Sequence, residues 1–137
     1  MWKRQKCIIF VVKKNVNIPD MEKDVAGVVE EAAVLRTENL VKKYFPEIKF
    51  AAVLGQRDAV PVKPDPAIVH DIMQMAGVAD TADIIYIGDS LVDLNTAKNS
   101  NVEFAAVTWG FCPRESLAEN SPAHIADNIE ELRVILL

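Results

Sequence analysis

Two aspartates and one lysine are the side chains of this sequence best suited to phosphate and metal chemistry. Asp89 and Asp93 stand four residues apart in "IIYIGDSLVDLNTAKNS", and Lys63 lies upstream in the proline-rich "VPVKPDP". Two converging carboxylates can bind Mg²⁺ together with water and phosphate oxygens. A lysine in a loop stiffened by prolines keeps its positive charge in one place, which suits phosphate binding. The pattern therefore indicates a Mg²⁺ and phosphate site.

The same three residues also have purely structural interpretations. Asp89 could be a turn residue, Asp93 could favour a helix N-terminus through its negative charge, and Lys63 could be solvated in an ordinary loop. The aspartate pattern alone does not separate the two interpretations. The lysine loop followed by a strand, Gly88 and the aspartate pair favours the site.

The elements that must position these residues are predicted from apolar patterns. Short apolar runs predict strands at 7–12, 50–55, 83–88 and 103–110, with a weak fifth strand at 123–127. Helical periodicity is predicted over most of 21–45, where 32–36 could instead be a short strand, and again at 90–99 and 128–137. Strands that alternate with helices indicate one α/β domain over residues 1–137 with a mainly parallel sheet.

One further helix is predicted between the lysine loop and the third strand. Asp65 is the expected N-cap with Pro66 at the first helical position, and Gly77 ends the helix. Ile68, Ile72 and Met75 are expected on its inner face.

The carboxyl ends of the strands are where an open parallel sheet binds its ligands. Asp89 follows the predicted strand 83–88, and Asp93 is expected on the first turn of the next helix, on the same side as Asp89. The two carboxylates are therefore expected to converge at this edge.

The composition excludes several classes of function. The chain has 137 residues and a net charge of −5, so a general nucleic-acid interface, which needs a basic face, is not expected. No apolar run approaches the roughly 18 residues of a membrane span, and "MWKRQKCIIFVV" is interpreted as a strand rather than a signal peptide. Cys7 and Cys112 are predicted to be free thiols in a reducing cytoplasm.

Several segments together resemble the haloacid dehalogenase-like hydrolases, and in particular their phosphoglycolate phosphatase branch. The matching segments are "VPVKPDPAIVHDIMQ", "IIYIGDSLVDLNTAKNS", "AAVTWGFCPRESL" and "HIADNIEEL", in a resemblance that runs from about residue 38 to residue 132. The resemblance implies a Rossmann-like three-layer sandwich and hydrolysis of small phosphate monoesters, such as 2-phosphoglycolate, with Mg²⁺.

The resemblance also implies roles for individual residues. Lys63 would stabilise the phosphoryl group and the nucleophile, and Asp89 and Asp93 would hold Mg²⁺ directly or through water. Thr108, Trp109 and Gly110 would lie near the substrate, although packing of Trp109 at the sheet edge is an equal alternative.

The sequence departs from the family at the first motif. The family's first strand ends in an Asp-x-Asp that supplies the nucleophile and the acid/base, and no Asp-x-Asp occurs in this chain. Residues 7–12 laid on that strand put Val11 at the nucleophile position and Lys13 at the acid/base position. Thr37 is the one candidate for the phosphate-binding residue of the second motif, and a role as a helix N-cap is the alternative.

The space before residue 38 is also too short for the family's helical cap, so a core without a cap is expected. An internal deletion, a frameshifted start or a shortened chain would each explain these gaps. The exposed rim left by the missing cap could favour homo-oligomers.

Three hypotheses follow. The first is a phosphatase of small phosphorylated metabolites that is catalytically impaired. The second is a non-catalytic module that binds phosphate or a protein partner. The third, a receiver-like domain with Asp89 as phospho-acceptor, does not explain the lysine loop.

Overall fold

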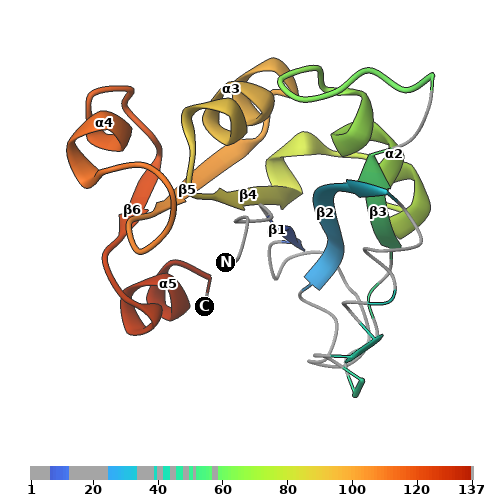
Figure 1. The fold of residues 1–137 in the computed structure, drawn as a ribbon, viewed down its shortest axis with the longest axis horizontal. Helices are drawn as coiled ribbons and strands as arrows, with labels where there is room; N and C mark the ends of the chain where they lie inside the picture. The colour runs from blue at the N-terminus through green and yellow to red at the C-terminus, as the bar shows by residue number, and fades with distance from the viewer. Residues whose placement is uncertain are drawn as a thin grey trace.

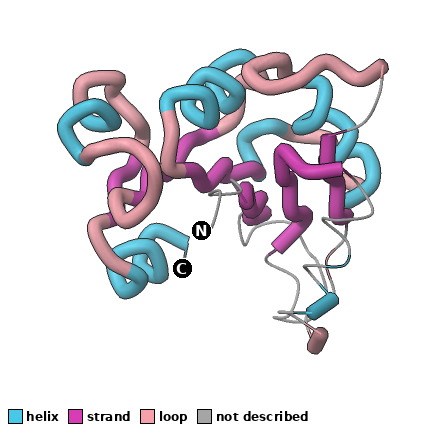
Figure 2. The backbone as a smooth tube through the Cα atoms, in the orientation of Figure 1, coloured by secondary structure: helices cyan, strands magenta, loops and turns pink. Residues whose placement is uncertain are grey.

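The computed structural model describes residues 7–12, 25–33, 39, 42–43, 46–47, 50, 52–56 and 59–136. A six-stranded sheet with the order β3-β2-β1-β4-β5-β6 runs through it (Figure 1). The strands are β1 (Cys7–Val12), β2 (Val25–Ala33), β3 (Ala52–Gln56), β4 (Ile84–Gly88), β5 (Glu103–Val107) and β6 (His124–Ala126). The helices are α2 (Ala67–Ala76), a 3₁₀ turn (Thr81–Asp83), α3 (Leu91–Asn99), α4 (Arg114–Ala118) and α5 (Ile129–Leu136). Strands alternate with helices from β3 onward (Figure 2), so the predicted α/β class is confirmed.

The sheet is parallel except at one strand. β2 pairs parallel with β3, and β4, β5 and β6 pair parallel with one another. β1 is antiparallel to both of its neighbours, β2 and β4, so these two neighbours run in the same direction. Five of the six strands therefore end at one edge of the sheet, which we call the carboxyl edge.

The direction of β1 corrects the prediction for the first motif. Residues 7–12 do form a strand beside β4, but Val11 pairs with Ile85 and Val12 with Ile84, at the start of β4 rather than at its end. Val11 therefore lies away from Asp89, and its comparison with the family's nucleophile position is wrong. The physical reason is that an apolar β-branched run suits a buried strand in either direction. Lys13 and Thr37 lie outside the described residues.

The helix predicted within 21–45 is also wrong over Val25–Ala33, which is β2. The segment pairs with β1 on one side and β3 on the other. Its valines suit a strand better than a helix, and the two ladders decide the outcome over the apolar period. The short strand predicted at 32–36 overlaps the last residues of β2.

Helices cover both faces of the sheet. α2, α3 and α4 contribute to the larger buried cluster, and α5 covers the other face over β5 and β6. Tyr86 and Phe104 lie in the larger cluster with their ring centroids 5.9 Å apart. None of the described helices has the length and hydropathy that crossing a bilayer would require.

The end of α2 follows the sequence prediction, whereas its start lies one residue later than predicted, with Pro66 rather than Asp65 at the N-cap. Asp65 Oδ1 accepts a hydrogen bond from the backbone N–H of Ala67 at 2.9 Å, and Gly77 closes the helix in the left-handed region at φ 70°. Ile68 and Ile72 are buried as predicted, but Met75 is 56% exposed, which corrects the third expected core position.

Candidate functional site

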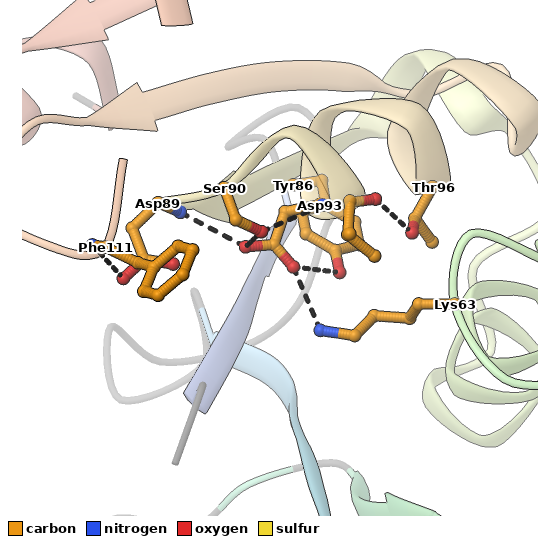
Figure 3. Close-up of polar contacts among 8 residues, drawn as sticks. Lys63, Tyr86, Asp89, Ser90, Asp93, Thr96 and Phe111 are labelled. Atoms are coloured by element: carbon orange, nitrogen blue, oxygen red, sulfur yellow. Dashed lines mark hydrogen bonds and ion pairs between the residues drawn. The ribbon is translucent and has the colours of Figure 1, made fainter. Parts of the chain in front are cut away.

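The candidate site lies at the carboxyl edge, where β4 passes into α3. β4 ends at Gly88, Asp89 follows it, and Ser90 is the N-cap of α3. The Ser90 side chain accepts a hydrogen bond from the backbone N–H of Asp93, which places Asp93 on the first turn as predicted. Figure 3 shows Asp89, Ser90 and Asp93 together with Lys63 and Phe111.

Asp93 is fully buried, and both of its carboxylate oxygens accept hydrogen bonds from the protein. Its Oδ1 accepts from Lys63 Nζ at 3.0 Å and from the Tyr86 hydroxyl at 3.4 Å. Its Oδ2 accepts from Ser90 Oγ at 2.8 Å and from the backbone N–H of Asp89 at 3.2 Å. The carboxylate therefore ties the lysine loop to the end of β4 and the start of α3.

Lys63 reaches Asp93 from a loop that is held from two sides. The side chain of Lys63 is 5% exposed in the ion pair with Asp93. Asn99 Nδ2, at the end of α3, donates to the carbonyl oxygen of Pro64 at 2.9 Å. The N–H of Asp65 donates to the carbonyl oxygen of Val62 at 3.0 Å and closes a turn around the lysine. The predicted fixed charge is thus present, with a buried carboxylate as its counter-ion.

Asp89 is oriented by the loop that follows β5. Its Oδ2 accepts from the backbone N–H of Phe111 at 2.9 Å, and its carbonyl oxygen accepts from the N–H of Cys112 at 2.9 Å. Gly110 lies so close that a Cβ at this position would overlap the Cβ and Oδ2 of Asp89. Glycine is therefore required for the close approach of this loop.

The two carboxylates share one edge but turn to different partners. The Asp89 side chain points toward Phe111, whereas the Asp93 carboxylate points toward Lys63 (Figure 3). Among the described residues, Asp89 Oδ1 accepts no hydrogen bond, so it is the carboxylate oxygen best placed to be a direct metal ligand. The described residues contain no cluster of three or more His, Cys, Asp or Glu that could hold a metal ion. The donor set fits a weakly held Mg²⁺ that takes most of its ligands from water or phosphate.

The remaining predicted residues lie in the loop after β5. Thr108 follows the last residue of β5, and Trp109 is 51% exposed beside Gly110. Half of the Trp109 side chain is thus covered, and both alternatives for it, packing at the sheet edge and proximity to a substrate, stay predictions. The loop lies against Asp89, as expected for residues near a site at this edge.

Sequence reasoning missed several residues that support the site. Tyr86 and Asn99 hold Asp93 and the lysine loop, and Asp127 holds both ends of the loop after β5. Ser90 had a local signal, because Ser-x-x-Asp before a helix resembles a capping box. The others had no local signal: the partner of Tyr86 is seven positions away without a helical or capping spacing, and the partners of Asn99 and Asp127 are 13 to 35 positions away.

Gly88→Ala tests how rigidly Asp93 is held. A Cβ at position 88 would lie 2.5 Å from the Cβ of Asp93 and 2.8 Å from its Oδ2. We expect a loss of about 1–3 kcal/mol in the free energy of unfolding, because overpacking forces the four-fold hydrogen-bonded carboxylate to move. Urea unfolding measures the loss. A change below about 0.5 kcal/mol, the range of neutral surface substitutions, would mean that α3 shifts without cost.

The fold and the site define an α/β domain that gathers charged side chains at the carboxyl edge of its sheet. A family model described as haloacid dehalogenase-like hydrolase matches residues 25–107. The chain belongs to this family.

Curated relatives support a narrower branch of this family, that of the phosphoglycolate phosphatases. The chain is 33% identical over 101 residues to phosphoglycolate phosphatase 1 of Pseudomonas aeruginosa, and 31% identical over 101 residues to phosphoglycolate phosphatase of Pseudomonas savastanoi pv. phaseolicola. Each match covers 71% of this chain and 37% of the relative. The chain thus spans little more than a third of the length of these relatives.

Solved structures agree with this placement. A protein from Lactobacillus delbrueckii subsp. bulgaricus, described provisionally as a phosphoglycolate phosphatase, superposes with a TM-score of 0.75 at 32% identity. The match covers 81% of this chain and 46% of that chain. A haloacid dehalogenase-like family protein from Streptococcus pneumoniae superposes with a TM-score of 0.69 at 22% identity, over 78% of this chain and 50% of that chain, and supports the fold alone.

Proposed function

We propose that this chain binds small phosphate monoesters at the carboxyl edge, as a phosphatase-family protein whose hydrolytic turnover is severely impaired. The single observation that carries the proposal is the joined arrangement of Lys63, Asp93 and Asp89 at this edge. A buried cation beside strand ends suits an anionic ligand. The relatives named phosphoglycolate phosphatase support a small phosphorylated metabolite, such as 2-phosphoglycolate, as the ligand class.

Mg²⁺ is the proposed cofactor. Asp89 would hold the ion through Oδ1, and Asp93 would act through the backbone N–H of Asp89 and through water. The ion would neutralise phosphate charge, while Lys63 would add a positive charge from the other side of Asp93. Such an ion would draw most of its ligands from water and phosphate, so phosphate and Mg²⁺ are expected to strengthen each other's binding.

Impaired turnover is proposed because β1, the described strand beside β4, offers no carboxylate nucleophile. β1 occupies the place beside β4, and its sequence, "CIIFVV", contains no aspartate or glutamate. The antiparallel direction of β1 also brings its amino end, rather than its carboxyl end, to the edge where Asp89 lies. The same observation favours a second candidate function, a non-catalytic phosphate-binding module.

Calorimetric titration with inorganic phosphate and with 2-phosphoglycolate, each with and without Mg²⁺, tests the proposed binding. The informative variant is Lys63→Met with Asp93→Asn, which removes the cation without leaving a buried charge unpaired. We expect it to weaken phosphate binding about tenfold or more, because a charge-assisted hydrogen bond contributes about 1.5–3 kcal/mol.

Lys98→Met is the matched control. Lys98 is an exposed lysine whose Nζ donates to the carbonyl oxygen of Asn120. Its replacement should leave phosphate affinity unchanged. Equal affinities in the parent and the double variant would contradict a phosphate site at Lys63.

A further inference from the structure

The loop after β5 is held by one carboxylate outside the site, that of Asp127. Thr108 Oγ1, at the start of the loop, donates to Asp127 Oδ1 at 2.9 Å. Arg114 Nε, just past the end of the loop, donates to Oδ1 at 3.0 Å and to Oδ2 at 3.1 Å. A single side chain therefore links the two ends of the segment from residue 108 to residue 114, and we call this link through Asp127 the clasp.

Asp127 is itself fixed by the start of α5. Its backbone N–H donates to Glu131 Oε2 at 2.7 Å. Asn128 and Glu131 bond reciprocally, since Asn128 Nδ2 donates to Glu131 Oε1 at 3.1 Å and the N–H of Glu131 donates to Asn128 Oδ1 at 3.0 Å. Asp127 thus connects the loop after β5 to the start of α5.

The middle of the loop is where Asp89 receives its hydrogen bonds. Packing holds this middle mainly at Cys112, which lies against the larger buried cluster, because Trp109 is 51% and Phe111 55% exposed. The N–H groups of Phe111 and Cys112 reach Asp89 only while the loop keeps its place.

From these contacts we infer that Asp127 is a positioning residue for the Asp89 carboxylate. It acts by clasping Thr108 and Arg114, which keeps the Phe111 N–H in reach of Asp89 Oδ2. The role is local rather than a support of the whole fold. Arg114 and Asp127 have 53% and 42% exposed side chains, and exposed ion pairs contribute little to global stability.

Amide hydrogen exchange in the full chain, followed by NMR, tests this role. In Asp127→Ala we expect the Phe111 and Cys112 amides to exchange about tenfold faster or more, because the loop opens locally. The amides of β4 and β5 should keep their parent rates, and the melting temperature should hardly change. The carboxylate bonds to both ends of the loop. Asp127→Ala should therefore accelerate exchange at Phe111 more than Thr108→Ala or Arg114→Gln does alone, and by as much as these two substitutions do together.

Asp80→Ala is the matched control. Asp80 Oδ1 accepts a backbone N–H, that of Ala82, in an exposed turn before β4, far along the strand from the carboxyl edge. Its loss should not change exchange at Phe111. Unchanged exchange at Phe111 in Asp127→Ala would overturn the inference, and so would equal acceleration across β4 and β5, which would indicate a general structural role.

A second readout links the clasp to the proposed function, on which that part of the inference rests. The variants that accelerate exchange most should also lower the affinity for Mg²⁺ most. The reason is that Asp89 Oδ1, the proposed ligand atom, belongs to the side chain that the Phe111 N–H holds in place. Faster exchange without Mg²⁺ binding in any form, the parent included, would leave the positioning role standing and overturn the metal proposal.

Discussion

Lys63→Met is expected to lower the free energy of unfolding by about 3–5 kcal/mol, because it leaves a buried carboxylate without its cation. The paired side chains are 5% exposed for Lys63 and 0% exposed for Asp93. Tyr86, Ser90 and the N–H of Asp89 still donate to the carboxylate, but none of these groups carries a positive charge. Urea unfolding, with a slope unchanged from that of the parent, measures the loss.

The double variant Lys63→Met/Asp93→Asn separates the missing charge partner from lost packing. A neutral amide at position 93 can keep hydrogen bonds to the start of α3, so the double variant should recover more than half of the loss. Lys98→Met should stay within about 0.5 kcal/mol of the parent, as surface substitutions usually do. A loss below about 1 kcal/mol for Lys63→Met, the range of exposed ion pairs, would show that solvent already screens the pair.

The turnover rate of this chain on p-nitrophenyl phosphate and on 2-phosphoglycolate is expected to lie at least about 10⁴-fold below an ordinary enzymatic turnover of about 1 per second. The reason is that β1, beside the end of β4, contains no carboxylate that could attack phosphorus. The charged edge proposed here could bind the substrate and stabilise its charge, but without a nucleophile on the strand beside β4 it is not expected to form the covalent intermediate. Release of phosphate with millimolar Mg²⁺ is the measurement.

Asp89→Asn is the control for contaminating phosphatases. Any trace rate that survives in this variant does not come from the site. Turnover near 1 per second that Asp89→Asn abolishes would show that a nucleophile comes from residues other than β1. The Val11→Asp/Lys13→Asp variant is not expected to restore activity, because Val11 pairs with Ile85 near the start of β4.

Much of the site could be predicted because its signals are local. Lys63 in its proline loop and the pair of Asp89 and Asp93 stand in short stretches whose elements were predicted in the right order. What the sequence could not predict is which atoms the carboxylates contact. Asp93 meets a lysine thirty positions upstream, and Asp127 meets a threonine nineteen positions away, so neither contact has a local pattern.

The sequence by itself determined the helices α2 and α3, the strands β3 to β6 and the class of the fold. Their determinants are short-range: Asp65 at the start of α2, Gly77 at its end, and Ser90 before α3 act on backbone groups a few residues away.

Only the tertiary structure decided the direction of β1, the strand at Val25–Ala33 and the clasp at Asp127. The physical reason is that an apolar strand satisfies its backbone equally well in parallel and antiparallel ladders. The direction of the strand is therefore chosen by the neighbours that the rest of the chain presents, and that choice decides which end of β1 lies at the edge where Asp89 stands.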